Sequence, residues 1–240
     1  MSRVVVRKFD KPRTLVEEVA VHLREMILNG TISPGERLNE LRLMQELSLS
    51  RSPLREAFRT LATEGLVTIS PRRGARVRPI SLEELRDVFE MRTLFETFAL
   101  TRAARRMAGA KVDQMRGLLG EARMALTRRD VEAWYASSQQ FHDAIVESAG
   151  NQQLKALYEF IKLSMRRYQL LVIGLPRHPD RSQVEHQRIF DALVRGNSRR
   201  ASALLEAHIQ RVAETLAAAL ARDARPDRED GRGRKEKAAR

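Results

Sequence analysis

Residues 50–78 constrain the fold more than any other part of the chain. The spacing predicts a helix over about 52–64 that Gly65 ends, followed by two strand-like segments, 66–69 and 75–78. A proline, two arginines and a glycine lie between these segments and supply the chemistry of a turn. The stretch holds seven arginines and two glutamates, a net charge of +5 (seven minus two). It therefore predicts a short cationic helix that leads directly into a basic β-hairpin.

Two earlier helices complete an N-terminal domain. Apolar residues recur at helical spacing over about 15–28, and a second helix is predicted near 40–47. The resulting order, three helices and then a β-hairpin wing, predicts a winged helix-turn-helix over 14–79. Residues 1–13 are expected to form a basic N-terminal arm.

From residue 82 onward the pattern is entirely helical, so the predicted fold class is mainly α. The all-α helical bundle spans 80–222 and is large enough to hold a cavity. The charged segment 223–240 has almost no apolar residues and is expected to be disordered. The predicted helices lie near 82–107, 112–127, 130–149, 151–173, 181–195 and 198–221.

The net charge of +13 over 240 residues favours an anionic partner. Residues 1–80 contribute +6 (fifteen minus nine), 81–220 contribute +4 (twenty-one minus seventeen) and 221–240 contribute +3 (eight minus five). Per residue, the excess lies in the first third and in the tail. Double-stranded DNA is therefore expected to bind the N-terminal third.

Other features limit the location and the chemistry. No run is long enough to span a membrane, and the N-terminus lacks the apolar stretch of a signal peptide. We expect a cytoplasmic protein with no membrane partner. Because the chain has no cysteine, any metal must use histidine, carboxylate or amide ligands.

The helix over 52–64 is the element expected to enter the major groove. Arg51 and Arg55 lie one turn apart and can face one groove, and short hydroxyl residues at the helix start suit phosphates. Arginines at the hairpin tip suit the negative potential of the minor groove. The alternative is that these arginines form only a solvated face. The residues expected to contact DNA are Arg42, Ser50, Arg51, Ser52, Arg55, Arg59, Arg72, Arg73 and Gly74.

Four sequence blocks here resemble the winged-helix domain of the GntR family of bacterial repressors. The resemblance implies direct DNA contacts by Arg51, Ser52 and Arg55, with Gly74 at the wing tip. The family usually has an operator-reaching arginine at the position of Leu41. Either the neighbouring Arg42 substitutes for it, or the operator preference has changed. The four blocks are PGERLNE at 34–40, SRSPLREA at 50–57, EGLV at 64–67 and PRRG at 71–74.

Three of the five histidines, His142, His186 and His208, lie on apolar faces of separate predicted helices. A buried histidine is most often a hydrogen-bonded core residue. Three of them in one bundle can instead converge, because facing helices bring side chains to a common centre. Neutral imidazole is also the commonest metal ligand.

The sequence around these histidines resembles the FCD ligand-binding domain of the FadR-type branch of the GntR family. Phe141-His142, Glu185-His186 and Ala207-His208 carry the resemblance. It implies a divalent metal (Zn, Ni or Mn) bound by the three histidines and, in many members, by an aspartate. Ser138 occupies the aspartate position here, which should weaken binding. The alternative is a pocket that holds water and ligand without metal.

Arg92 lies on an apolar helix face with Glu96 one turn further on, and a buried guanidinium needs a partner. It pairs with Glu96, or it receives a carboxylate ligand in bidentate fashion. The resemblance favours the second role, because Arg-x-x-x-Glu recurs at the family's effector pocket. The expected effector is a small organic acid or sugar acid, and the expected effector-binding residues are Arg92, Glu96, Ser138 and Gln139.

These sequence features are compatible with three functions. The leading hypothesis is a non-enzymatic transcriptional regulator that is expected to repress a metabolic operon and to bind a palindromic operator as a homodimer. The second hypothesis is a hydrolase whose metal ion is bound by the three histidines. It lacks an obvious general base, because Glu185, next to His186 in the sequence, is turned about 100° away from it on a helix. The third is a non-specific architectural DNA-binding protein.

Overall fold

The computed structural model describes residues 14–104, 109–173, 175 and 177–223. The chain divides into two compact units, residues 1–80 and 81–240. The predicted arm, 1–13, and residues 224–240 of the predicted tail lie outside the described residues. No helix in the described part is both long enough and apolar enough to cross a membrane.

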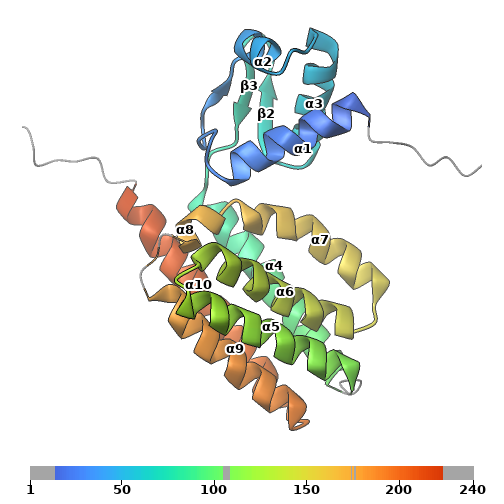
Figure 1. Ribbon diagram of the computed structural model, residues 1–240, viewed down its shortest axis with the longest axis vertical. Coiled ribbons are helices and arrows are strands. Elements are labelled where there is room, and N and C mark those ends of the chain that lie inside the picture. Colours follow the sequence, from blue (N-terminus) through green and yellow to red (C-terminus); the bar gives the residue numbers. More distant parts are fainter. Residues whose placement is uncertain (1–13, 105–108, 174, 176, 224–240) are drawn as a thin grey trace, which may run out of the picture. The chain divides into compact units, whose positions relative to one another are not determined.

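The N-terminal unit holds three helices and a three-stranded antiparallel sheet in the order β1-β3-β2 (Figure 1). Strand β1 was not predicted, because two residues are too few to show alternation. The elements are α1 (Leu15–Leu28), β1 (Arg37–Leu38), α2 (Glu40–Glu46), α3 (Arg51–Thr63), β2 (Val67–Ser70) and β3 (Gly74–Val77).

Local capping and a shared apolar core explain the helices of this unit. Thr14 and Glu17 form a capping box at the start of α1. Helices α1 and α3 pack together, and Leu23, Leu54 and Leu61 are fully buried. Ser50 occupies the N-cap position of α3 with extended backbone, but its hydroxyl makes no capping hydrogen bond.

The wing turn requires two residues with positive φ. Ser70 pairs with Gly74 in the sheet, so the loop is residues 71–73. Arg72 has φ +64° and Gly74 has φ +80°. Glycine adopts this backbone without strain, whereas a side chain there would also approach Arg37. Gly74 therefore begins β3, and the tip is formed by the three residues before it.

The C-terminal unit is all helical across its described residues. The helix predicted over 82–107 ends at Ala103, and its last predicted residues, 105–107, lie outside the described residues. The helix predicted over 151–173 is divided at Arg167–Tyr168. The helix predicted from 181 begins at His178, because Pro179 is tolerated in a first turn. The elements are α4 (Leu82–Ala103), α5 (Ala110–Thr127), α6 (Val131–Ser148), α7 (Gln152–Arg166), α8 (Gln169–Ile173), α9 (His178–Val194) and α10 (Ser198–Asp223).

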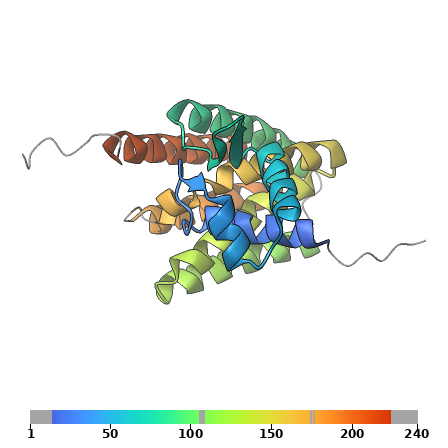
Figure 2. The same ribbon diagram turned by 90° about the horizontal axis from the view of Figure 1, so that it is seen from above.

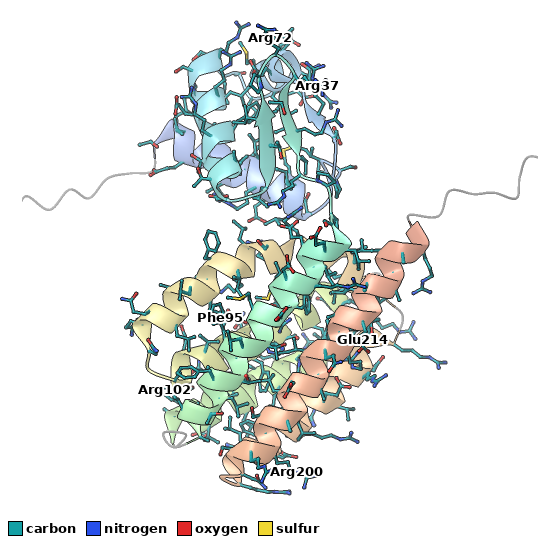
Figure 3. All side chains as sticks on the ribbon, turned by 180° about the vertical axis from the view of Figure 1, so that it is seen from behind. Arg37, Arg72, Phe95, Arg102, Arg200 and Glu214 are labelled. Atoms are coloured by element: carbon teal, nitrogen blue, oxygen red, sulfur yellow. The ribbon has the colours of Figure 1, made fainter. Side chains whose placement is uncertain are left out.

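Helix α6 lies in the core of this unit and contacts α4, α5, α7, α8 and α9. Trp134, Phe141 and Ile145 are at most 1% exposed on it. Helices α4 and α10 lie side by side in both Figure 2 and Figure 3. This arrangement brings polar side chains from α4, α6, α9 and α10 to the centre of the bundle.

Candidate functional sites

The predicted DNA-contacting arginines of α3 form one exposed stripe. Arg51, Arg55 and Arg59 recur every four residues, beside the buried face that begins with Leu54. Glu40, at the start of α2, accepts hydrogen bonds from Nε of Arg55 at 3.1 and 3.3 Å and lies 3.9 Å from Nε of Arg51. One carboxylate thus restrains both side chains, a role that the sequence did not reveal because it depends on how α2 meets α3.

A groove of about 410 Å³ separates α3 from the wing. Arg55, Arg59 and Arg72 line it, together with Arg37 of β1, which the sequence analysis missed. Figure 3 shows Arg37 and Arg72 at the same end of this unit. Only the pairing of β1 with β3 places Arg37 there. Arg73, Ser50 and Ser52 are also exposed.

The second helix carries the departure from the family pattern. Leu41 is 63% exposed on α2. Arg42 is exposed too, but its Nε donates to Glu46 at 2.7 Å, one turn further along the helix. Arg42 and Leu41 therefore point in different directions, about 100° apart around α2.

His142 on α6, His186 on α9 and His208 on α10 converge in the core. Each is at most 4% exposed. The Nε2 atom of His186 lies 3.1 Å from the Nε2 atoms of both His142 and His208. One ring nitrogen from each of the three falls within 4.8 Å of the others, as a common ligand centre requires.

Two carboxylates hold the outer nitrogens of this cluster. Glu96 accepts a hydrogen bond from Nδ1 of His142 at 2.6 Å, and Glu185 accepts one from Nδ1 of His208 at 2.7 Å. A carboxylate accepts only, so each Nδ1 carries the proton and each Nε2 presents a lone pair inward. The expectation that Glu185 is turned away from the cluster was wrong: it points away from His186 and toward His208 on the next helix.

Burial and charge keep the cluster neutral around pH 7. Burial lowers the pKa of His208 to about 3 and that of His186 well below its ordinary value. Hydrogen bonds from His208 and Arg211 lower the pKa of Glu185 to about 2, although burial opposes them. Neutral imidazoles and ionised carboxylates are the forms that a metal centre needs.

Arg92 and Glu96 form the intrahelical pair considered above. Nε of Arg92 donates to Glu96 at 2.7 Å, and the hydroxyl of Tyr158 donates to the same oxygen at 2.8 Å. Glu96 is 0% exposed. Arg92 and His142 line the cavity that adjoins the histidine cluster, whereas Glu96 does not. Nη2 of Arg92 is buried and has no hydrogen-bond partner among the described residues.

A cavity of about 30 Å³ adjoins the histidine cluster, with room for about two water molecules. Arg92, Ser138 and Gln139 line it, as do His142 and His208. Three further lining residues, Trp134, His178 and Ser182, were not predicted from the sequence. Of these, His178 lies between the helices predicted over 151–173 and 181–195. The other lining residues are Phe89, Tyr135, Met165, Val172 and Val212.

A winged helix carrying exposed arginines, joined in one chain to a helical bundle with a polar core site, defines a class of ligand-responsive DNA-binding proteins. Residues 15–77 match the model for bacterial regulatory proteins of the gntR family, and residues 87–211 match the FCD domain. The chain belongs to the GntR family of transcriptional regulators with an FCD domain. Proteins of this family bind DNA and regulate transcription, and they are not enzymes.

Individual relatives agree with this assignment. The chain is 28% identical over 211 residues to the HTH-type transcriptional regulator YdhC of Bacillus subtilis strain 168, covering 87% of this chain and 94% of YdhC. It is 30% identical over 153 residues to the gluconate operon transcriptional repressor of Bacillus licheniformis, covering 64% and 63%. The solved structure of Escherichia coli McbR/YncC shares the fold, with a TM-score of 0.71, 19% identity and coverage of 87% and 100%.

Proposed function

We propose that this protein represses a metabolic operon by binding a palindromic operator as a homodimer, and that a small organic acid or sugar acid releases it. The observation that carries the proposal is the joint occurrence of two sites: an exposed arginine stripe on α3 and a buried, neutral histidine cluster beside Arg92. The first supplies contacts to DNA, and the second supplies contacts to an anion.

The DNA half of the proposal assigns base or phosphate contacts to Arg51, Arg55 and Arg59, with Arg37 and Arg72 following the adjacent groove. Footprinting on the DNA upstream of the protein's own gene tests it. We expect protection by the wild type and none by Arg55→Ala. The matched control is Arg116→Ala, an exposed arginine on α5. If Arg55→Ala protects the DNA as well as the wild type does, the α3 surface is not the DNA-binding surface. If the wild type protects every DNA sequence alike, an architectural DNA-binding protein is favoured instead.

A second copy of the chain is the partner that fits the apolar face of α4 and α7. These helices contact one another, and five large apolar side chains on them are 39–73% exposed: Met91, Leu94, Phe98, Leu157 and Phe160. Their spacing of three and four residues places each set on one helix face. Several exposed large apolar side chains on two neighbouring helices are typical of an interface, and a two-fold dimer matches a palindromic operator.

The histidine cluster fits a divalent metal such as Zn, Ni or Mn. With both Nδ1 protons directed to Glu96 and Glu185, His142 and His208 present only lone pairs to the centre. A single proton on Nε2 of His186 can be donated to only one of these two lone pairs at full strength. A cation at the centre would instead accept lone pairs from all three Nε2 atoms. The metal would act as a Lewis acid toward an effector carboxylate. Ser138 adds no negative charge, so the metal's charge would remain available to an anionic effector.

Effector binding can change DNA affinity because the cavity is small. An acid larger than about two water molecules must displace the lining residues of α4, α6, α9 and α10. A ligand that binds the expanded arrangement more tightly shifts the population toward it. The sugar acid in the name of the Bacillus licheniformis relative makes gluconate a reasonable first probe.

Metal analysis of the purified protein after dialysis tests the metal. We expect about one equivalent per chain in the wild type and a loss in His186→Ala, with exposed His22→Ala as the control. Equal metal content in wild type and His186→Ala would exclude the site.

A further inference from the structure

The lining of the proposed effector cavity includes residues with buried polar atoms that the metal and Arg92 do not explain. Nε1 of Trp134 and Nδ1 of His178 are buried and have no hydrogen-bond partner among the described residues. Trp134 is 1% exposed and His178 is 6% exposed, and both line the cavity. Buried polar groups are nearly always paired, so two unpaired atoms in one cavity wall point to a ligand.

Both atoms are hydrogen-bond donors. An indole nitrogen can only donate. For His178, the neighbouring contacts favour a proton on Nδ1: Nη2 of Arg211 donates to the hydroxyl oxygen of Ser182 at 2.9 Å, and that oxygen lies 3.5 Å from Nε2 of His178. The Ser182 hydroxyl can then donate to Nε2, which leaves the proton of a neutral ring on Nδ1. Burial and the charge of Arg211 lower the pKa of His178 to about 4, consistent with a neutral ring.

The geometry keeps these donors together. The rings of Trp134 and His178 meet edge to face, with centroids 6.1 Å apart. His178 begins α9, one turn before Ser182 on the same helix. Arg211, which donates a hydrogen bond to Ser182, also forms an ion pair with Glu185 at 2.6 Å. Glu185 in turn accepts a hydrogen bond from His208. A continuous chain of hydrogen bonds therefore joins this wall to the histidine cluster.

We infer that Trp134 and His178 form a second recognition point that selects effectors with an acceptor oxygen, such as a hydroxyl, in addition to the carboxylate. The inference rests on the proposed function, because it assumes that the carboxylate binds at Arg92 and the histidine cluster. An unsubstituted aliphatic acid would leave both donors unpaired and buried, and a site built around hydrogen bonds discriminates strongly against such a ligand.

Matched pairs of acids test this specificity in the full-length, metal-loaded protein. The probes are propanoate against lactate, succinate against malate, and hexanoate against gluconate, with affinities measured by calorimetry. We expect at least one hydroxylated member to bind the wild type about tenfold or more tightly than its partner. In Trp134→Phe and His178→Phe that preference should fall to within about threefold, while the affinity for the unsubstituted acid is retained. His22→Phe, in the N-terminal unit, is the matched control.

The single tryptophan of the chain provides a direct readout. Its indole N–H gives one resonance in a ¹⁵N-correlated spectrum, and a hydrogen bond to a ligand oxygen should shift the proton downfield. The hydroxylated acid should produce this shift, and its unsubstituted partner should not.

The outcomes separate the two hypotheses. Equal binding of both members of every pair, or an unchanged preference in both variants, would overturn the second recognition point and leave the carboxylate site intact. If none of the six acids binds while operator binding is normal, both this inference and the proposed carboxylate effector fail. Far-ultraviolet circular dichroism of the variants identifies any loss of folding, and His178→Gln, which keeps an N–H donor, should recover part of the preference.

Discussion

Glu185 and His208 are joined across two helices by a 2.7 Å hydrogen bond, although Glu185 is next to His186 in the sequence. Arg211 holds the same carboxylate through Nε and Nη2. Glu185 therefore positions one imidazole of the cluster while its sequence neighbour supplies another. A bond of this kind sets the tautomer of a metal-binding histidine and raises its basicity.

Replacing this carboxylate should weaken metal binding without removing a ligand. Glu185→Gln can accept from only one of its two partners at full strength, so we expect metal affinity to fall about 10- to 100-fold. Competition with a chromogenic chelator measures the change. Glu206→Gln, an exposed position on α10, is the control and should retain wild-type affinity. Wild-type affinity in Glu185→Gln would show that the Glu185 carboxylate is not needed to orient His208.

An arginine at position 41 should strengthen binding to DNA. Leu41 is 63% exposed on α2, and the added guanidinium would gain about one phosphate contact. The slope of log affinity against log salt should steepen by about 0.9 in Leu41→Arg. Fluorescence anisotropy at several salt concentrations measures it. Leu41→Ala should keep the wild-type slope, and an unchanged slope in Leu41→Arg would place α2 away from the DNA backbone.

A charge on the apolar face of α4 and α7 should produce monomers. Phe160 is 73% exposed, so Phe160→Asp costs the isolated chain little, whereas a buried aspartate in a dimer interface lacks a partner. Light scattering after size exclusion should give the mass of one chain, 27.5 kDa. Val194→Asp, at an exposed apolar residue of α9, should remain dimeric. A dimer that survives both Phe160→Asp and Phe98→Asp would place the interface elsewhere.

Acid should destabilise the protein partly through His178. Its pKa in the folded state is about 4, below the ordinary value of 6.5, because burial and Arg211 disfavour the charged ring and outweigh Glu185. The unfolded chain thus takes up a proton between pH 6.5 and 4 that the folded chain does not, so stability falls as the pH is lowered through this window. The contribution is at most about 1.4 kcal/mol per pH unit.

Urea unfolding at pH 7.5, 6.5 and 5 measures this dependence. His178→Phe should show a shallower loss of unfolding free energy between pH 6.5 and 5 than the wild type. Exposed His22→Phe should follow the wild type. Parallel curves for the wild type and His178→Phe would mean that other groups carry the acid sensitivity.

The sequence by itself determined the elements and their order, because periodicity, caps and turn residues are local. The winged helix followed by a helical bundle, the exposure of Arg51 and Arg55, and the burial of His142, His186 and His208 all follow from which face of a helix is apolar. The same local reasoning failed at His178, where a proline within the first helical turn resembled a loop.

The tertiary structure alone decided which side chains meet. Glu40 reaches Arg55, Arg37 reaches the groove beside α3, and Glu185 reaches His208 only because separate elements pack at particular distances. The unpaired donors of Trp134 and His178 could not be predicted either, because pairing depends on every neighbour in three dimensions. Periodicity tells which side chains enter the core, whereas packing fixes the partners that they find there.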